Sequence, residues 1–246
     1  LGQLAAAWRA RHTLPLIAVT GSNGKTTTKE MIASILGAAF GDAVLATRGN
    51  LNNDIGLPLT LLKLRPQHRA AIVEMGINHP GEIAYLARIA RPTVALVTNA
   101  QRAHLQGMGS LDAIAREKGS IYEGLALDGV AVVNADDAEC GLWCDMNRDR
   151  HVVDFGFDPV AAIHGDVRLH GLDNELRSVT PAGEGAVDLA LPGRHNARNA
   201  LAAIAACFAA GVPLAAIDRG LAAFKGVKGR LQRRAGINGA TVLDDT

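Results

Sequence analysis

The sequence has few cysteines, few aromatic residues and almost no net charge. Three cysteines, Cys140, Cys144 and Cys207, are too few for a disulfide framework, and the Cys140/Cys144 pair has no second pair with which to complete a zinc site. We therefore expect reduced thiols and a cytoplasmic location. The 25 basic and 24 acidic residues give a formal charge of +1 and are scattered, which makes nucleic acid a poor candidate partner.

Long apolar runs are also missing. None reaches the ~20 residues that a membrane helix needs, and the first residues, LGQLAAAWRARH, lack the pattern of a secretory signal. With 246 residues, 48% of them apolar, the chain can bury a core in one large domain or two small ones. The chain starts at Leu1 and stops after VLDDT. We expect a soluble piece of a longer protein, without membrane insertion and monomeric.

The order of apolar segments predicts an α/β fold. Short strands rich in β-branched residues alternate with stretches of helical length rich in alanine and leucine, which is typical of a mostly parallel sheet flanked by helices. We assign this sheet to residues 13–157 and 192–246. Residues 158–191 are broken by glycine and proline and predict a small antiparallel β-hairpin layer. We expect residues 1–246 to form one domain.

The stretch TGSNGKTTT, from Thr20 to Thr28, predicts a phosphate-binding loop. The glycines allow a tight turn and a close backbone approach, and Lys25 and Thr26 open the following helix, whose unpaired N–H groups suit a phosphate. Lys25 would reach the β- and γ-phosphates and Thr26 would join a Mg²⁺ shell. Val19 stands where the general loop pattern has glycine, so the loop is a shortened variant.

The shortened loop resembles that of the Mur ligases, which reads T-G-[ST]-N-G-K-[TS]. Further stretches resemble the branch of this family that handles D-alanyl-D-alanine, and they follow in the same order along nearly the whole chain. They are GNLNNDIGLPLTLL (49–62), EMGINHPGEIAYL (74–86), AHLQGMGSLDAIAREKGSIYEGL (103–125), LPGRHNARNALAA (191–203), and KGRLQ (228–232) followed by LDDT.

This resemblance implies the central ATPase domain of a ligase of peptidoglycan precursor synthesis, without the N- and C-terminal domains. The implied activity is ATP-dependent addition of D-alanyl-D-alanine to UDP-N-acetylmuramoyl-tripeptide through an acyl phosphate. ATP and two Mg²⁺ ions are the implied cosubstrate and metals. Cell-wall synthesis would in turn connect the protein with cell shape and cell division.

The resemblance also implies a set of catalytic residues around the loop. Lys25 would hold phosphate, and Glu74 would bind Mg²⁺ together with Thr26. Alone, a carboxylate at a strand end is only slightly more often functional than structural. His104 would bind a second Mg²⁺, and Lys118 matches a lysine that many Mur ligases carbamylate to bridge metals. Without the resemblance, a lone histidine and a lysine on an amphipathic helix more often have no such role.

The remaining implied contacts are to the nucleotide and the acceptor. Asn196 is favoured over Asn199 as the contact to the base, Arg230 would contact phosphate or ribose, and Asp245, rather than Asp244, would accept a ribose hydroxyl. Asn52 and Asn53 would face the acceptor substrate. The expected ATP-binding loop residues are Gly21, Ser22, Asn23, Gly24, Lys25, Thr26 and Thr27.

Three other functions remain open from the sequence. A folylpolyglutamate synthase shares the fold and acyl-phosphate chemistry, although GNLNNDIG and EMGINHPGEIAYL argue against it. A non-catalytic ATP-binding module would not need Glu74, His104 and Lys118 together. A phosphoryl-transfer kinase is disfavoured by the shortened loop.

Overall fold

The computed structural model describes residues 1–246 except 102–109, 171–172, 231, 236, 238–240 and 245–246. The strands are β1 (Leu16–Thr20), β2 (Val44–Ala46), β3 (Ala70–Glu74), β4 (Val94–Val97), β5 (Val130–Asn134), β6 (His151–Gly156), β7 (Ile163–His170), β8 (Asp173–Thr180), β9 (Gly183–Leu189), β10 (Gln232–Ala235) and β11 (Thr241–Asp244). The helices are α1 (Gly2–Arg9), α2 (Lys25–Phe40), α3 (Gly56–Leu61), α4 (Glu82–Ala90), α6 (Leu111–Gly119), the 3-10 turn η1 (Ser120–Gly124), α7 (Cys140–Met146), α8 (Arg194–Ala209) and α9 (Leu214–Ala223).

A nine-stranded sheet organises the molecule, in the order β2-β3-β1-β4-β5-β6-β7-β8-β9. All neighbours from β2 to β7 are parallel, and β7, β8 and β9 are antiparallel. The predicted fold class, a mostly parallel sheet with a small antiparallel part, is confirmed. The antiparallel strands extend the same sheet, because Phe155 and Gly156 at the end of β6 pair with the start of β7.

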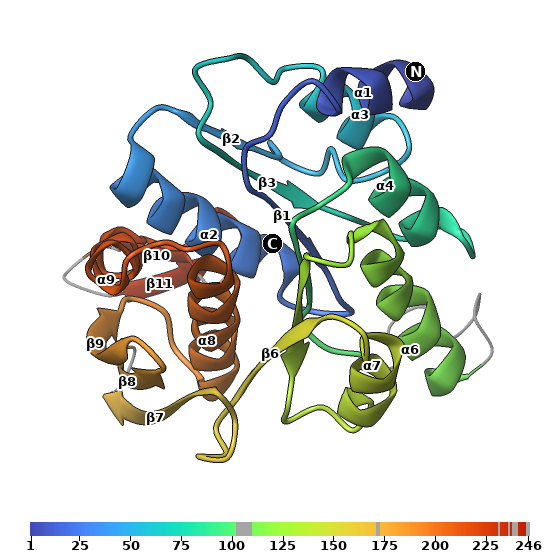
Figure 1. Cartoon of the computed structure of the whole chain (residues 1–246). Helices are drawn as coiled ribbons and strands as arrows, with labels where there is room; N and C mark the ends of the chain where they lie inside the picture. Colours follow the sequence, from blue (N-terminus) through green and yellow to red (C-terminus); the bar gives the residue numbers. More distant parts are fainter. Residues whose placement is uncertain (102–109, 171–172, 231, 236, 238–240, 245–246) are drawn as a thin grey trace.

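Helices cover both faces of the sheet and create two apolar cores (Figure 1). Alternate residues of β1 point to opposite faces: Ile17 and Val19 pack with α2, α8 and α9, whereas Leu16 and Ala18 pack with α1, α3 and α4. Because both faces are buried, all five residues of β1 are buried. This explains the continuous apolar runs that predicted the parallel sheet.

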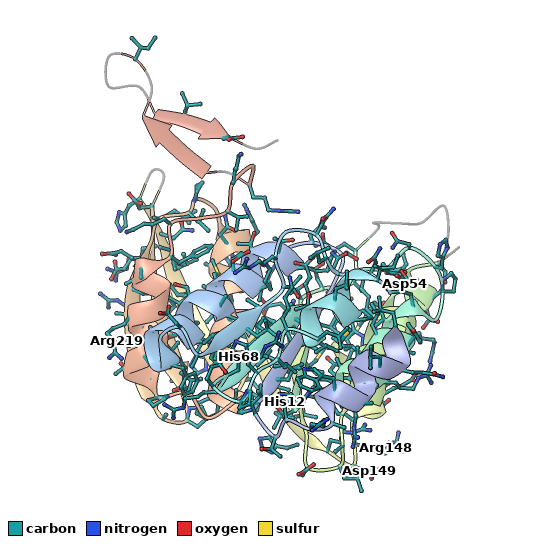
Figure 2. All side chains as sticks on the ribbon, turned by 90° about the horizontal axis from the view of Figure 1, so that it is seen from above. His12, Asp54, His68, Arg148, Asp149 and Arg219 are labelled. Atoms are coloured by element: carbon teal, nitrogen blue, oxygen red, sulfur yellow. The ribbon has the colours of Figure 1, made fainter. Side chains whose placement is uncertain are left out.

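The last two strands leave the main sheet. β10 and β11 pair only with each other in a two-stranded antiparallel sheet, which stands out from the rest of the molecule in Figure 2. The sequence analysis assigned residues 192–246 to the main sheet, whereas β10 and β11 within this range form a separate sheet. β10 reads QRRA, which offers too little apolar surface for a buried position.

Among the described residues, no helix combines the length and the apolar character required to cross a bilayer.

The parallel register brings three functional segments to one edge of the sheet. Val19 lies opposite Glu74 on β3, and Thr20 lies opposite Val97 on β4. The loop after β1, the carboxylate at the end of β3 and the polar segment after β4 therefore meet. Ligands of open α/β sheets bind at this carboxyl edge.

Candidate nucleotide and metal site

The loop after β1 is shaped by two glycines with left-handed backbones. Gly21 has φ +149°, and a Cβ there would lie 1.9 Å from Thr98 Oγ1. Gly24 has φ +79°, and a Cβ there would lie 2.3 Å from Asn199 Oδ1 of α8. The loop is therefore held between β4 and α8, where no side chain fits at either glycine.

Two polar residues after β4 fasten the loop from the side. Asn99 Oδ1 accepts the Asn23 N–H at 3.0 Å, while Asn99 Nδ2 donates to the Asn23 carbonyl at 3.0 Å. Ser22 Oγ accepts the Gln101 N–H at 2.9 Å and donates to the Gln101 carbonyl at 3.0 Å. These paired contacts hold the loop open for a ligand before any nucleotide arrives.

Lys25, the first residue of α2, bends back over the loop. Its Nζ donates to the Gly21 carbonyl at 2.8 Å and to the Ser22 carbonyl at 3.2 Å. Burial lowers the pKa of Lys25, and Arg230 acts in the same direction, whereas the Glu74 carboxylate raises it. The ammonium group is thus positioned over the helix start, where a phosphate would also meet the backbone N–H groups and the helix dipole.

Glu74 is buried at the end of β3, and only one of its two carboxylate oxygens accepts hydrogen bonds from described residues. Oε1 accepts from Asn52 Nδ2 at 2.8 Å and from Thr26 Oγ1 at 3.3 Å. Oε2 is buried and has no hydrogen-bond partner among the described residues. The backbone is fixed by Thr47, whose Oγ1 accepts the Glu74 N–H at 3.0 Å. A buried carboxylate oxygen without a partner is the feature expected of a cation ligand.

Lys118 lies on α6, which distant segments hold in place. Glu117 accepts the Gly81 N–H at 2.8 Å at the start of α4, and Trp143 Nε1 of α7 donates to the Ala115 carbonyl at 3.0 Å. Lys118 is only 1% exposed, so it is not the solvated lysine that its amphipathic helix alone would favour. Its Nζ has no partner among the described residues.

The environment of Lys118 favours an uncharged amine. Burial, reinforced by repulsion from Lys25 and opposed by a smaller effect of Glu117, lowers the pKa of Lys118 to about 7. The repulsion also means that Lys118 and Lys25 are within electrostatic range of each other. The role of Lys118 in the site stays a prediction.

The donor set fits a divalent cation in part. Glu74 Oε2 and the Thr26 hydroxyl are hard oxygen donors, and the two side chains contact each other. A carbamate on Lys118 would add two more oxygen donors. An unmodified ammonium group on Lys118 would instead repel the ion. The described residues contain no group of three or more His, Cys, Asp and Glu side chains able to hold a metal. This suits Mg²⁺, which takes few protein ligands and completes its shell with water and substrate phosphates.

A cavity of about 290 Å³ continues from the loop toward α8. Asn23, Gly24 and Thr27 line its phosphate end, and the remaining lining residues are Asn99, Gln101, His195, Asn196, Arg198, Asn199 and Arg230. The predicted nucleotide residues Asn196 and Arg230 are thus brought to the loop. Asn196 donates to the Pro192 carbonyl at 2.8 Å, and its Oδ1 accepts from Asn199 at 3.3 Å. Its contact to a base stays a prediction.

The predicted acceptor residues have local partners. Asn52 contacts Glu74, as described above, and Asn53 Oδ1 accepts the Gly56 N–H at 2.8 Å, at the first turn of α3. Asn52 therefore lies beside the carboxylate, whereas Asn53 contacts the start of α3. The role of both asparagines toward a substrate stays a prediction. His104 and Asp245 lie outside the described residues.

Some residues at the site were not predicted from the sequence. Thr47, Gln101 and Arg198 each have a side chain or backbone group that supports the site or its cavity. Gln101 lies just after a strand on the ligand-binding edge, a signal that could have identified it. Thr47 and Arg198 carry no such signal, because only the tertiary fold brings them here.

Substitution Gly24→Ala is expected to abolish nucleotide binding by the loop. The added Cβ would lie 2.3 Å from Asn199 Oδ1, so the Asn199 side chain would have to move, and the left-handed backbone of the loop would be strained. Gly81→Ala is a matched control, since Gly81 has φ +82° but no atom within 4 Å of the added Cβ. The control should lose only about 1–2 kcal/mol of stability from backbone strain. Calorimetric titration with ADP and thermal unfolding test both variants, and equal ADP affinity in Gly24→Ala would contradict the assignment.

The fold and this site define a class of protein, the ATP-dependent Mur ligases. The family model described as the Mur ligase middle domain matches residues 19–207, more than half of the chain, and the chain belongs to that family.

Individual relatives are more specific. Over 253 aligned residues the chain is 44% identical to UDP-N-acetylmuramoyl-tripeptide--D-alanyl-D-alanine ligase from Escherichia coli K12, covering 100% of this chain and 54% of that protein. The crystal structure of MurF from Acinetobacter baumannii superposes with a TM-score of 0.94 at 40% identity, covering 100% of this chain and 53% of that one. MurF ligase from Thermotoga maritima in complex with ADP gives a TM-score of 0.84 at 27% identity, covering 100% and 56%. The chain thus spans about half the length of the relatives it matches.

Proposed function

We propose that the chain is the ATP-binding centre of a ligase that joins D-alanyl-D-alanine to UDP-N-acetylmuramoyl-tripeptide in peptidoglycan precursor synthesis. The proposal is supported by the electrostatic proximity of Glu74 and of Lys118 to Lys25, in a chain 44% identical to an enzyme of that name. We further propose that residues 1–246 form a single central domain of a cytoplasmic, monomeric enzyme, with the other domains outside this chain.

The first step proposed is attack of the tripeptide carboxylate on the γ-phosphate of ATP. A carboxylate is already a competent nucleophile, so no general base is required, and the protein contributes positioning and charge stabilisation. The backbone N–H groups at the start of α2 and the Lys25 ammonium stabilise the negative charge that spreads over the transferred phosphoryl group. ADP leaves, and an acyl phosphate forms.

In the second step the amino group of D-alanyl-D-alanine attacks the acyl carbon, and phosphate leaves from a tetrahedral intermediate. Asn52, held by Glu74, lies at the sheet edge where the two substrates would meet. The product is UDP-N-acetylmuramoyl-pentapeptide, with one new peptide bond. The other products are the ADP formed in the first step and the inorganic phosphate released in the second.

Mg²⁺ would be held by Glu74, Thr26 and, once carbamylated, Lys118, with His104 as a further proposed ligand. When bound, the metal neutralises phosphate charge and orients the reacting oxygens. Two ions are proposed, as the resemblance to the Mur ligases implies.

The direct test is mass spectrometry of products formed by the full-length protein with UDP-N-acetylmuramoyl-tripeptide, D-alanyl-D-alanine and ATP. Pentapeptide and ADP in equal amounts are expected. A parallel reaction with a folate and glutamate tests the folylpolyglutamate synthase alternative, and ATP bound without turnover would indicate a non-catalytic module. Absence of the pentapeptide in the complete mixture would refute the proposed function.

A further inference from the structure

A guanidinium group is held at the wall of the cavity that adjoins the predicted phosphate loop. Arg198, on α8, lines this cavity together with Asn196 and Asn199 of the same helix. Its side chain is 35% exposed, so part of it is accessible from the cavity. The reaction proposed above gives Arg198 no role.

Two chain segments hold this arginine. Arg198 Nε donates to Asp136 Oδ2 at 3.1 Å, after β5, and Arg198 Cζ lies 5.3 Å from the centroid of the Phe157 ring, after β6. Asp136 is itself fixed, because its Oδ1 accepts the Phe157 N–H at 3.0 Å. A Cβ on Gly156 would lie 2.5 Å from Asp136 Oδ1, so only glycine there permits this contact.

The Arg198 side chain has more orienting contacts than an ordinary surface ion pair provides. An exposed arginine commonly loses side-chain entropy when it pairs and contributes little to stability. Here the carboxylate and the aromatic ring orient the guanidinium plane, and no guanidinium nitrogen other than Nε has a hydrogen-bond partner among the residues that the structure describes. The plane and its free N–H groups are therefore available to a ligand.

We propose that Arg198 forms the wall on which the base of the nucleotide stacks, with Asp136 and Phe157 as its positioning residues. The inference rests on the proposed function, since it assumes that a nucleotide binds with its phosphates at Gly24 and Lys25. The nucleoside then extends along the cavity toward His195 and Arg198. A guanidinium plane stacks on bases and aromatic rings, whereas an ammonium group cannot.

The same helix supplies a matched control. Arg194 also stacks on Phe157, with Cζ 4.2 Å from the ring centroid, but it is exposed and does not line the cavity. Arg194→Ala removes a similar charge and a similar ring contact without touching the proposed base site. Its nucleotide affinity should equal that of the wild type.

The experiment is calorimetric titration of the full-length protein with a methylene analogue of ATP and, separately, with inorganic tripolyphosphate. Arg198→Ala should weaken binding of the analogue about tenfold and leave tripolyphosphate binding unchanged. Arg198→Lys should lose as much affinity as Arg198→Ala, because it keeps the charge and loses the plane. Asp136→Asn should show a smaller loss with the same pattern, and thermal unfolding confirms that each variant is folded.

Different results would refute different statements. A wild-type protein that binds neither probe would refute the proposed function. If the wild type binds both probes but Arg198→Ala binds the analogue as well as wild type does, the base-stacking role is wrong and the proposed function stands. A parallel loss of tripolyphosphate binding, or full rescue by lysine, would make Arg198 a phosphate contact and would equally overturn the proposal.

Discussion

Substitution Lys25→Ala is expected to lower turnover of the full-length protein by about a thousandfold or more. Lys25 is the cation that lies over the loop, with its Nζ 2.8 Å from the Gly21 carbonyl. Without it, the charge that develops on the transferred phosphoryl group would lose the ammonium group positioned over the loop. The measurement is ADP release and pentapeptide formation at saturating substrates, so that weaker ATP binding does not account for the loss.

A control variant separates this effect from a general loss of charge. Lys63, just after α3, is exposed, and Lys63→Ala should retain full turnover. Lys25→Arg keeps the positive charge but places a larger planar group in a tight loop, so it should recover only part of the activity. Turnover of Lys25→Ala at the wild-type rate would remove the phosphate-loop assignment.

The main sheet could be predicted because the pattern of apolar residues along the sequence indicates which strands are buried. Strands such as β1 and β3 are buried over their whole lengths and read as unbroken apolar runs. The short elements were not predicted. β2 has three residues and is only partly buried, and α3 has six residues that include Pro58, so neither is long enough to show a period.

The site was predictable where it depends on strand ends. Gly21 follows and Glu74 ends a buried strand of a parallel sheet, and such strand ends meet at one edge. Residues placed by packing between distant helices were not accessible in this way. The burial of Lys118 requires α4 and α7, whose Gly81 and Trp143 contacts are far from it in sequence.

Substitution Lys118→Ala is expected to reduce ligation as severely as loss of Lys25. The buried Nζ has no described partner and faces the same site, so a carbamate formed there would be a metal ligand that no neighbouring side chain replaces. Arg116→Ala is the control, because Arg116 lies on the same helix, is exposed and pairs with Asp112. Lys118→Arg should also be inactive, since arginine cannot carry a carbamate. Wild-type activity in either Lys118 variant would contradict the role.

The state of the amine is measurable without catalysis. In bicarbonate-free buffer the pKa of Lys118 is about 7 in the folded chain, below its ordinary value of 10.5. Between these values the unfolded chain binds more protons, so the free energy of unfolding contributed by this residue rises with pH through that window. Relative to Lys118→Met, the wild type should gain at least about 1 kcal/mol between about pH 7 and pH 10.

Bicarbonate provides the second arm of this experiment. Carbamylation requires the neutral amine, which a pKa of about 7 makes abundant at neutral pH. Added bicarbonate should therefore flatten the pH dependence of unfolding in the wild type, increase its mass by one carbamate under native conditions and raise its ligase activity, with no effect on Lys118→Met. An unchanged mass together with unchanged activity would show that Lys118 acts as a free amine, and the second metal would then need a different ligand.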